Sequence, residues 1–299
     1  DLGSESPYYP WMDAMPRTFS TALSFDDFEM SCLPPFVKFL ADRDRENFNL
    51  FVWVLQQLNT PTISASTKAN MQVLQWAFNI VFTRARPAYG GAEIIPMSDM
   101  MNHAWNANCV VQYDDDANVH VVLQRDVPAG EALSKCYGQP TNPSRFMSTY
   151  GFFDASPPTT YCKLMPSLLE QMPELANLGF DYNRMVFSVA DGEVAPEVWD
   201  VMLYLGLAST NPTLQQEFYQ AVVQGDDAKK ARIHQQNMSQ TFYNLLAHVS
   251  EVLEEIADCQ EVMDQGGMGL AHKNLPTIRR HNEFVRQVFI KVQRNLQQM

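Results

Sequence analysis

Side chains able to carry out chemistry are concentrated between Ile95 and Phe153. Each also has a purely structural explanation: Asn102 and His103 suit a hydrogen-bonded turn, and Tyr137 suits a half-buried strand. The three carboxylates at 114–116 could in principle bind a cation. An oxygen cage needs more ligands at set spacing, however, so a solvated hairpin tip is favoured. The functional information therefore lies in the order and spacing of the whole set.

That set consists of five short motifs in a fixed order. They are P-x-x-D-x-x-N-H at 96–103, N-A-N-C at 106–109, D-V-P-A-G-E at 126–131, Tyr-Gly at 137–138 and Y-G-F at 150–152. The elements that must position them are short strands. Runs of β-forming residues at 110–113 and 119–123 flank turn residues and predict a hairpin, and a further short run covers 132–137.

Helices are predicted on both sides of these strands. Apolar residues recur three and four apart from Asp26 to about Leu58, which predicts one or two helices, after an irregular packed segment at 7–16. Ser66 and Thr67 are the expected caps of a second helix that ends near Arg86. After Pro157 the periodicity is helical with few strand signals, and the predicted helices cover 167–178, 196–207, 212–223, 227–259 and 276–296. On residues 227–259 a stripe of apolar positions is expected to be a core face.

The sequence thus predicts a helix-rich α+β fold in three parts. Residues 1–92 form a helical part, residues 93–155 hold the strands, and residues 156–299 form an all-α part. A length of 299 residues by itself favours two domains, each able to bury a proper core.

Composition excludes several classes of protein. With 34 acidic and 21 basic side chains the net charge is −13, which argues against direct nucleic-acid binding and favours a basic partner. Five dispersed cysteines form no C-x-x-C pair, so no metal site is predicted and an intracellular, reducing compartment is expected. No apolar run reaches the roughly 20 residues that a membrane-spanning helix needs, so no membrane insertion is expected.

The ordered motifs resemble the SET domain of protein methyltransferases. The nearest class includes the plastid Rubisco large-subunit lysine methyltransferase and the actin histidine methyltransferase. Two outlying segments agree with it: the aromatic and proline-rich segment 7–16, and the W-A-F helix from Trp76 to Arg84. The resemblance implies a SET β-core with a helical insertion at 1–92, followed by an all-α substrate-binding-type domain. It also admits a plastid location beside a cytoplasmic or nuclear one.

The resemblance assigns roles to six residues. Tyr137 matches the catalytic tyrosine beside the transferred methyl group. Asn102 and His103 match cofactor contacts, and Arg84 matches a helix arginine at the cofactor end of the pocket. Tyr150 and Phe152 match the aromatic wall shared by cofactor and substrate. The implied cofactor is S-adenosylmethionine, and the implied partner is a basic protein or peptide substrate.

Methyl transfer from a sulfonium is an in-line displacement, so the acceptor nitrogen must be neutral and aligned. A lysine with a pKa of about 10.4 must therefore first lose a proton, which costs about 4 to 5 kcal/mol at pH 7. A histidine acceptor, with a pKa of about 6.5, makes fewer demands on the pocket. The two retained aromatics Tyr150 and Phe152 favour lysine, since aromatic walls hold a flexible amine.

Three departures from the family pattern leave an alternative open. The family's N-terminal strand-turn segment bearing G-x-G is missing before Pro7, and we expect it upstream of Asp1. The asparagine expected seven residues before Tyr150 is displaced, because Pro143 holds that position and Asn142 precedes it. Trp105 stands where a small residue or cysteine is usual. The alternative is a catalytically degenerate SET-fold subunit that serves as a structural or docking component of a larger assembly.

Overall fold

The computed structural model describes residues 2–88, 91–138, 143–266 and 272–299. These residues fall into two compact units. Unit 1 comprises those within Asp1–Asp26, Phe39–Pro140 and Arg145–Phe153, and unit 2 comprises those within Asp27–Lys38, Thr141–Ser144 and Asp154–Met299. The predicted three-part division of the chain stays a prediction.

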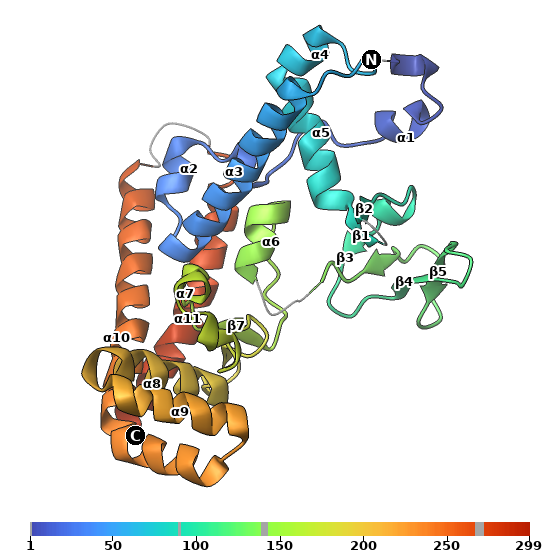
Figure 1. The fold of residues 1–299 in the computed structure, drawn as a ribbon. Helices are drawn as coiled ribbons and strands as arrows, with labels where there is room; N and C mark the ends of the chain where they lie inside the picture. Colours follow the sequence, from blue (N-terminus) through green and yellow to red (C-terminus); the bar gives the residue numbers. More distant parts are fainter. Residues whose placement is uncertain (1, 89–90, 139–142, 267–271) are drawn as a thin grey trace. The chain divides into compact units, whose positions relative to one another are not determined.

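Unit 1 has helices on both sides of its strands in the sequence. They are α1 (Tyr9–Asp13), the part of α3 (Pro35–Gln57) from Phe39 onward, α4 (Ala65–Ala69), α5 (Met71–Arg84) and the end of α6 (Pro143–Tyr150). Helices α3 and α5 lie side by side (Figure 1). Their aromatic rings pack together: the ring of Phe78 lies 5.4 Å from that of Phe48 and 5.6 Å from that of Phe51, centroid to centroid. This pair of helices carries Arg84 at the end of α5.

Three small sheets follow in unit 1. β1 (Arg86–Ala88) pairs antiparallel with β2 (Gly91–Glu93), and β4 (Cys109–Tyr113) pairs antiparallel with β5 (Val119–Leu123). β3 (Asn102–His103) pairs in parallel with β6 (Ser134–Lys135). At the tip of the β4–β5 hairpin the carboxylate of Asp114 accepts from the backbone N–H groups of Asp116 and Asn118, at 3.0 and 2.8 Å. The predicted hairpin is therefore confirmed, and its acidic tip is an exposed turn.

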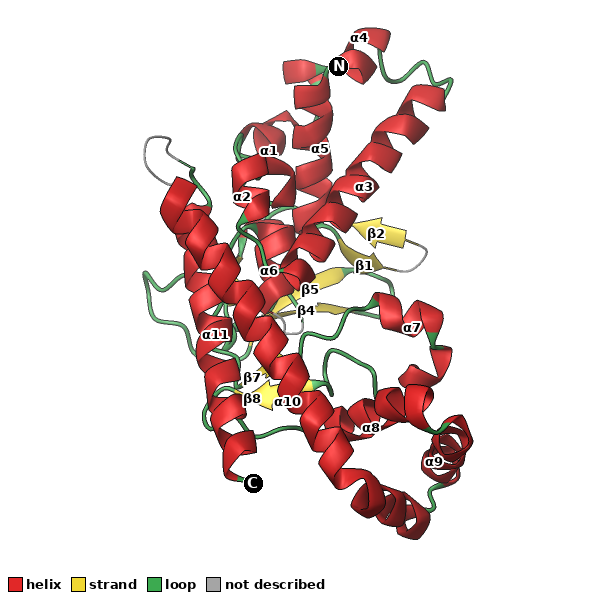
Figure 2. Cartoon of the chain, turned by 90° about the vertical axis from the view of Figure 1, so that its left-hand side faces the viewer, coloured by secondary structure: helices red, strands yellow, loops and turns green. Residues whose placement is uncertain are grey.

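Unit 2 is built mainly on helices, some of them only five residues long. They are α2 (Asp27–Ser31), α7 (Ser167–Gln171), α8 (Pro196–Thr210), α9 (Pro212–Gln224), α10 (Asp227–Gly266) and α11 (Leu275–Gln298). Helices α10 and α11 pack side by side, and α8 and α9 pack near the start of α10 (Figure 2). The apolar stripe predicted on α10 is a core face, since Leu245, Val249 and Ile256 are buried against α8 and α11 residues.

The helix-rich α+β class is confirmed, with some local differences. Residues 156–299 also contain a small antiparallel sheet, β7 (Thr159–Tyr161) with β8 (Val186–Ser188), which the periodicity does not reveal. The opening segment contains the short helix α1, where an irregular segment is predicted. The predicted strand at 132–137 is only the two residues of β6, and the predicted helix at 167–178 is α7 followed by a 3-10 helix, Pro173–Ala176.

The predicted caps at Ser66 and Thr67 are wrong. Ser64 caps α4 by accepting from the N–H of Thr67, and Asn70 caps α5 by accepting from the N–H of Val73 at 3.3 Å. The reason is that the chain turns twice where the sequence indicates one break, so each helix uses the polar residue directly before it.

Two further observations concern the whole described chain. All five cysteines are free thiols, four of them buried and Cys136 exposed. Within the ranges that the structure describes, no helix combines the length and apolar character needed to cross a membrane.

Candidate functional site

The motif residues of unit 1 converge on one cavity of about 360 Å³. All six residues assigned from the resemblance line it, namely Arg84, Asn102, His103, Tyr137, Tyr150 and Phe152. They come from α5, β3, the segment after β6, and the end of α6. The tertiary structure thus brings together residues that span 69 positions of sequence; their individual roles stay predictions.

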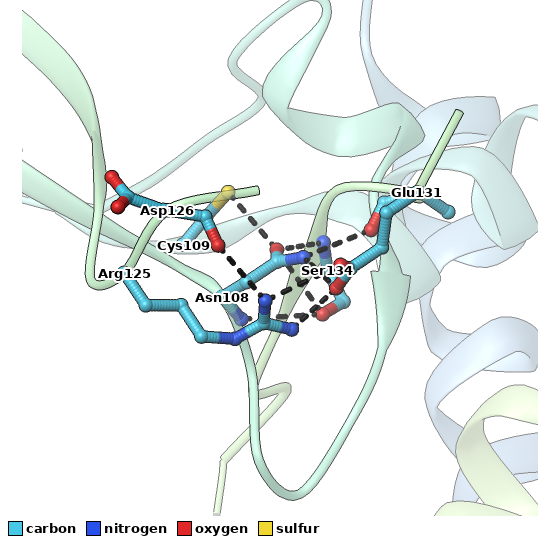
Figure 3. A network of polar contacts seen from close by, with 7 residues as sticks. Asn108, Cys109, Arg125, Asp126, Glu131 and Ser134 are labelled. Atoms are coloured by element: carbon cyan, nitrogen blue, oxygen red, sulfur yellow. Dashed lines mark hydrogen bonds and ion pairs between the residues drawn. The ribbon is translucent and has the colours of Figure 1, made fainter. Parts of the chain in front are cut away.

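Strand pairing sets the position of the first three motifs. In the parallel ladder Asn102 lies opposite Ser134 and His103 opposite Lys135. The N-A-N-C motif fastens this ladder to β4 through the buried side chain of Asn108 (Figure 3). Its Oδ1 accepts from the N–H of Ser134 at 2.8 Å, and its Nδ2 donates to Glu131 Oε1 at 3.1 Å. Residues of the first three motifs therefore hold one another in place.

Tyr137 is held at both ends. Its hydroxyl donates to the carbonyl of Met101 at 2.7 Å, and its backbone N–H donates to Nδ1 of His103 at 3.1 Å. The second bond makes Nδ1 an acceptor, which places any proton of a neutral His103 ring on Nε2. Burial raises the pKa of the Tyr137 hydroxyl, an effect that the positive charge of Arg84 partly opposes. Tyr137 is therefore a neutral phenol at pH 7, oriented by Met101.

Aromatic rings form one wall of the cavity. Tyr137 and Tyr150 lie 4.9 Å apart between ring centroids, and Tyr150 and Phe152 lie 5.8 Å apart. The buried ring of Phe146 lies 4.7 Å from His103 and 5.4 Å from Phe152. The cluster is continuous, so substitution of one ring is expected to shift the others.

A buried carboxylate anchors the arginine of the site. Asp99 accepts from Arg84 through both its backbone carbonyl, at 2.6 Å, and its side chain, at 3.5 Å. The indole N–H of Trp11 donates to the same carboxylate at 3.2 Å. The Nε of Arg84 is buried and has no hydrogen-bond partner among the described residues. The site therefore contains a donor that a bound group could satisfy.

A second cavity of about 550 Å³ shares Arg84, Tyr137 and Tyr150 with the first. Among the charged side chains of its lining, Arg84, Arg86 and Lys135 are basic and Asp99 is acidic. Lys135 Nζ lies 5.7 Å from the ring centroid of Tyr137, and burial lowers the pKa of this lysine. The exposed Trp105, one of the departures from the family pattern, also lines this cavity.

Several contributors were missed by sequence reasoning. Lys135, Phe146 and the carbonyl of Met101 carry no pattern that marks them. Asp99 stands in the P-x-x-D motif, and Trp11 in the aromatic opening segment, but their contact spans 88 residues and has no local signal. Of the family departures, Pro143 begins α6, and Asn142 lies outside the described residues.

Metal ligation finds no support in the described part of the chain. Within those ranges no three His, Cys, Asp or Glu side chains lie in an arrangement that could hold a metal ion. The side chains that line the first cavity include aromatic rings, the hydroxyls of Tyr137 and Tyr150, the imidazole of His103 and the guanidinium of Arg84.

Comparison with known proteins gives one kind of match. No protein-family model and no curated protein matches the sequence. Among solved structures, the SET domain of LSMT bound to lysine and AdoHcy has a TM-score of 0.63 at 14% identity, covering 98% of this chain and 71% of that one. Rubisco LSMT bound to AdoMet has a TM-score of 0.62 at 13% identity, covering 99% and 71%. The chain has the fold of these SET-domain structures.

A third structure agrees with them. Rubisco LSMT bound to sinefungin and monomethyllysine has a TM-score of 0.64 at 15% identity, covering 99% of this chain and 71% of that one. The likeness in fold to these structures therefore extends over almost the whole chain. At these identities the likeness is one of fold, and the activity has to be argued from the site.

Proposed function

We propose that this chain is an S-adenosylmethionine-dependent protein N-methyltransferase that acts on a lysine side chain. The observation that carries the proposal is the cavity whose lining includes Tyr137 and the five other residues assigned from the motifs. Structures with the same fold are described as bound to AdoMet, AdoHcy and lysine or monomethyllysine, which supports the same ligand classes here.

The residues present fit the cofactor. A volume of about 360 Å³ lies within the range of about 300–1,000 Å³ typical of small-molecule sites. The buried Nε of Arg84 would donate to the carboxylate of the amino-acid portion. The rings of Tyr137, Tyr150 and Phe152 would face the sulfonium, since aromatic faces attract cations. When bound, S-adenosylmethionine would supply an electrophilic methyl group on its sulfonium.

Tyr137 would position the reacting groups. Its proton is engaged by the Met101 carbonyl, so the hydroxyl oxygen is left to accept from polarised C–H groups or from an amine N–H. Its pKa is raised by burial, which keeps it neutral and avoids a competing nucleophile. The role is orientation, in which small misplacements cost large factors in rate.

Tyr150 and Phe152 would hold the acceptor amine. Their rings form a wall that excludes water and favours a desolvated nitrogen, which lowers the cost of deprotonating lysine. A lysine side chain reaches such a wall with its apolar stem, while its amine meets the aromatic faces. The acidic surface of the chain would attract a basic substrate and mainly raise the association rate.

Methyl transfer from labelled S-adenosylmethionine to lysine-containing peptides tests the proposal. We expect Tyr137→Phe to lower turnover about 10²-fold without loss of folding, because a positioning contact is removed. Tyr243→Phe is the matched control, since Tyr243 is 64% exposed and lies in unit 2. Equal turnover in all three proteins would contradict the role of Tyr137, and the absence of cofactor binding at millimolar concentration would contradict the enzyme proposal.

A second candidate is a SET-fold subunit that docks onto a larger assembly. The observation that favours it is on α3, where Leu50, Trp53 and Val54 are 59%, 59% and 41% exposed. Positions i, i+3 and i+4 lie on one helix face, and exposed apolar clusters commonly mark protein contacts. This candidate predicts a stable stoichiometric complex that Trp53→Ser weakens and Tyr137→Phe leaves intact. Efficient methyl transfer by the isolated chain would exclude a purely structural role.

A further inference from the structure

Unit 2 contains a cavity of its own, of about 360 Å³. It lies among α2-to-α3 residues, the segment after β7, and the faces of α10 and α11, and it shares no lining residue with the cavities of unit 1. Most of the lining is apolar, as Phe36, Leu168 and Ile256 illustrate. A pocket of this size with a few polar groups is typical of small-molecule binding.

The polar group that stands out in this lining is Lys163. It is 7% exposed and adopts a left-handed backbone conformation, with φ of 64°. Its Nζ donates to Ser144 Oγ and lies 5.0 Å from the ring centroid of Phe36, itself a lining residue. Among the described residues no carboxylate lies within ion-pair distance of this amine. A buried ammonium without a counter-ion is costly, so this lysine favours its neutral form.

A directional chain of hydrogen bonds fixes the amine. His281 Nδ1 and Asn282 Oδ1 are 3.1 Å apart, and because that oxygen only accepts, Nδ1 carries the ring proton. Nε2 is then an acceptor for the hydroxyl of Ser144, at 3.0 Å. The hydroxyl oxygen in turn accepts from Lys163, and Asn282 Nδ2 donates to the carbonyl of Cys32 at 3.1 Å. These hydrogen bonds hold one N–H group of Lys163. They supply no donor to the lone pair of the neutral amine nitrogen.

The charges around the cavity argue against an anionic ligand. The exposed Glu251 and the part-exposed Glu255 bring two carboxylates to its lining from α10. The other titratable groups near the amine are His248, His281 and Cys162, which burial keeps neutral. An uncharged, mostly apolar ligand with an electrophilic atom therefore fits the site better than a carboxylate does.

We infer that this cavity binds an apolar aldehyde or ketone, which forms an imine with Lys163. The lone pair of Nζ attacks the carbonyl carbon, and both N–H hydrogens leave with the carbonyl oxygen as one molecule of water. The product is a C=N bond in place of the C=O bond, and no oxidant or reductant takes part. Desolvated lysines in apolar pockets are the type that forms such adducts.

The electrostatics agree with this geometry. Burial lowers the pKa of Lys163 to about 7, against an ordinary value near 10.5. About half of this amine is then neutral at pH 7, compared with less than about one part in a thousand for an exposed lysine. The neutral fraction alone gives Lys163 an advantage of about a thousandfold as a nucleophile.

Reductive trapping tests the inference. The full chain is incubated at pH 7 with benzaldehyde and cyanoborohydride, and the benzylated lysines are located by peptide mass spectrometry. We expect Lys163 to be modified more than tenfold faster than any other lysine side chain at pH 7. Cyanoborohydride reduces the protonated imine, so each rate is compared with that of exposed lysines at the same pH. The advantage of Lys163 should shrink from pH 7 to pH 10, because its neutral fraction grows little above a pKa of about 7 whereas theirs keeps growing. Lys163→Met removes the modification, whereas Lys273→Met, at an exposed lysine of the same unit, leaves it unchanged.

Three outcomes would overturn the inference. The first is modification spread over exposed lysines while Lys163 stays unmodified. The second is an advantage of Lys163 over exposed lysines that stays constant from pH 7 to pH 10. The third is saturable binding of benzoate with no adduct from benzaldehyde, which would identify an anion site instead. Mapping the unaltered chain gives the primary result, so the test does not depend on folding of the Lys163 variant.

Discussion

At the scale of single residues, the buried carboxylate of Asp99 shows how the site is held. Its side chain is 1% exposed and is paired with the guanidinium of Arg84, whose side chain is 17% exposed. The indole of Trp11 supplies the other described donor. A paired buried charge of this kind adds little net stability, but removal of one partner leaves an uncompensated charge.

We therefore expect Arg84→Met to lower the free energy of unfolding by about 3 kcal/mol, because Asp99 would stay buried without its cation. Arg17→Met is the control, since the Arg17–Asp13 pair is 59% and 58% exposed. That change should cost less than about 1 kcal/mol, even though Arg17 also lies over the Trp76 ring. Urea denaturation of both variants checks the difference, and equal losses would contradict this account of Asp99.

At the scale of elements, the glycine of the Y-G-F motif fixes how the end of α6 meets the rest of unit 1. Gly151 has φ of 77°, and a Cβ there would lie 2.2 Å from the backbone oxygen of Ser20. The motif glycine is thus needed twice, for the left-handed backbone and for the close approach of two chain segments. Tyr150 and Phe152 flank it, so the aromatic wall depends on this contact.

Gly151→Ala is expected to lower unfolding stability by more than about 3 kcal/mol and to reduce methyl transfer, because the segment carrying the aromatic wall must move. Gly130→Ala separates the effect of the left-handed backbone from that of the close approach to another segment. Gly130 also has a positive φ, of 90°, but a Cβ there meets nothing within 4 Å. Gly130→Ala should therefore lower the free energy of unfolding by only about 1–2 kcal/mol, through backbone strain alone. Thermal melts of the two variants measure the contrast, and similar values would show that the close approach has little weight.

At the scale of the whole molecule, the buried series of hydrogen bonds from Lys163 to Asn282 makes the stability of unit 2 depend on pH. Burial, with a smaller contribution from the charge of Lys163, lowers the pKa of His281 to about 3. The unfolded chain binds a proton at this ring near pH 6.5, whereas the folded chain does not until about pH 3. Stability from this residue is therefore present above pH 6.5 and is lost as the pH falls below it.

We expect the stability of unit 2 to fall between pH 6 and pH 4 by up to about 1.4 kcal/mol per pH unit through His281 alone. Hydrogen exchange of α11 amides, corrected for the intrinsic rate, measures this without assuming that both units unfold together. His281→Gln should reduce the slope of stability against pH by about 1.4 kcal/mol per pH unit. This holds even if the substitution changes the stability of unit 2 at neutral pH. His120→Gln, at an exposed hairpin residue, should leave the slope of unit 2 unchanged. An equal slope in the His281 variant would contradict the assignment.

The sequence by itself determined the features that depend on near neighbours. The β4–β5 hairpin follows from two runs of β-forming residues on either side of the turn at 114–118, and the core face of α10 follows from its apolar spacing. Through the family resemblance, the five motifs named five residues that line one cavity, and the W-A-F helix named the sixth, Arg84. The hairpin and the core face are local features, because the hydrogen bonds of turns and the periodicity of helices are set within a few residues.

Only the tertiary structure decided what depends on distant partners. The bond from Tyr137 to the Met101 carbonyl, the pairing of Trp11 with Asp99, and the buried chain joining Lys163 to Ser144 and His281 each connect segments far apart in sequence. The short strands β7 and β8 stabilise each other across 24 intervening residues and have too few residues to show a period. Burial and charge compensation are properties of the packed chain, which is why the sequence indicated the residues of the site but not the contacts that hold them.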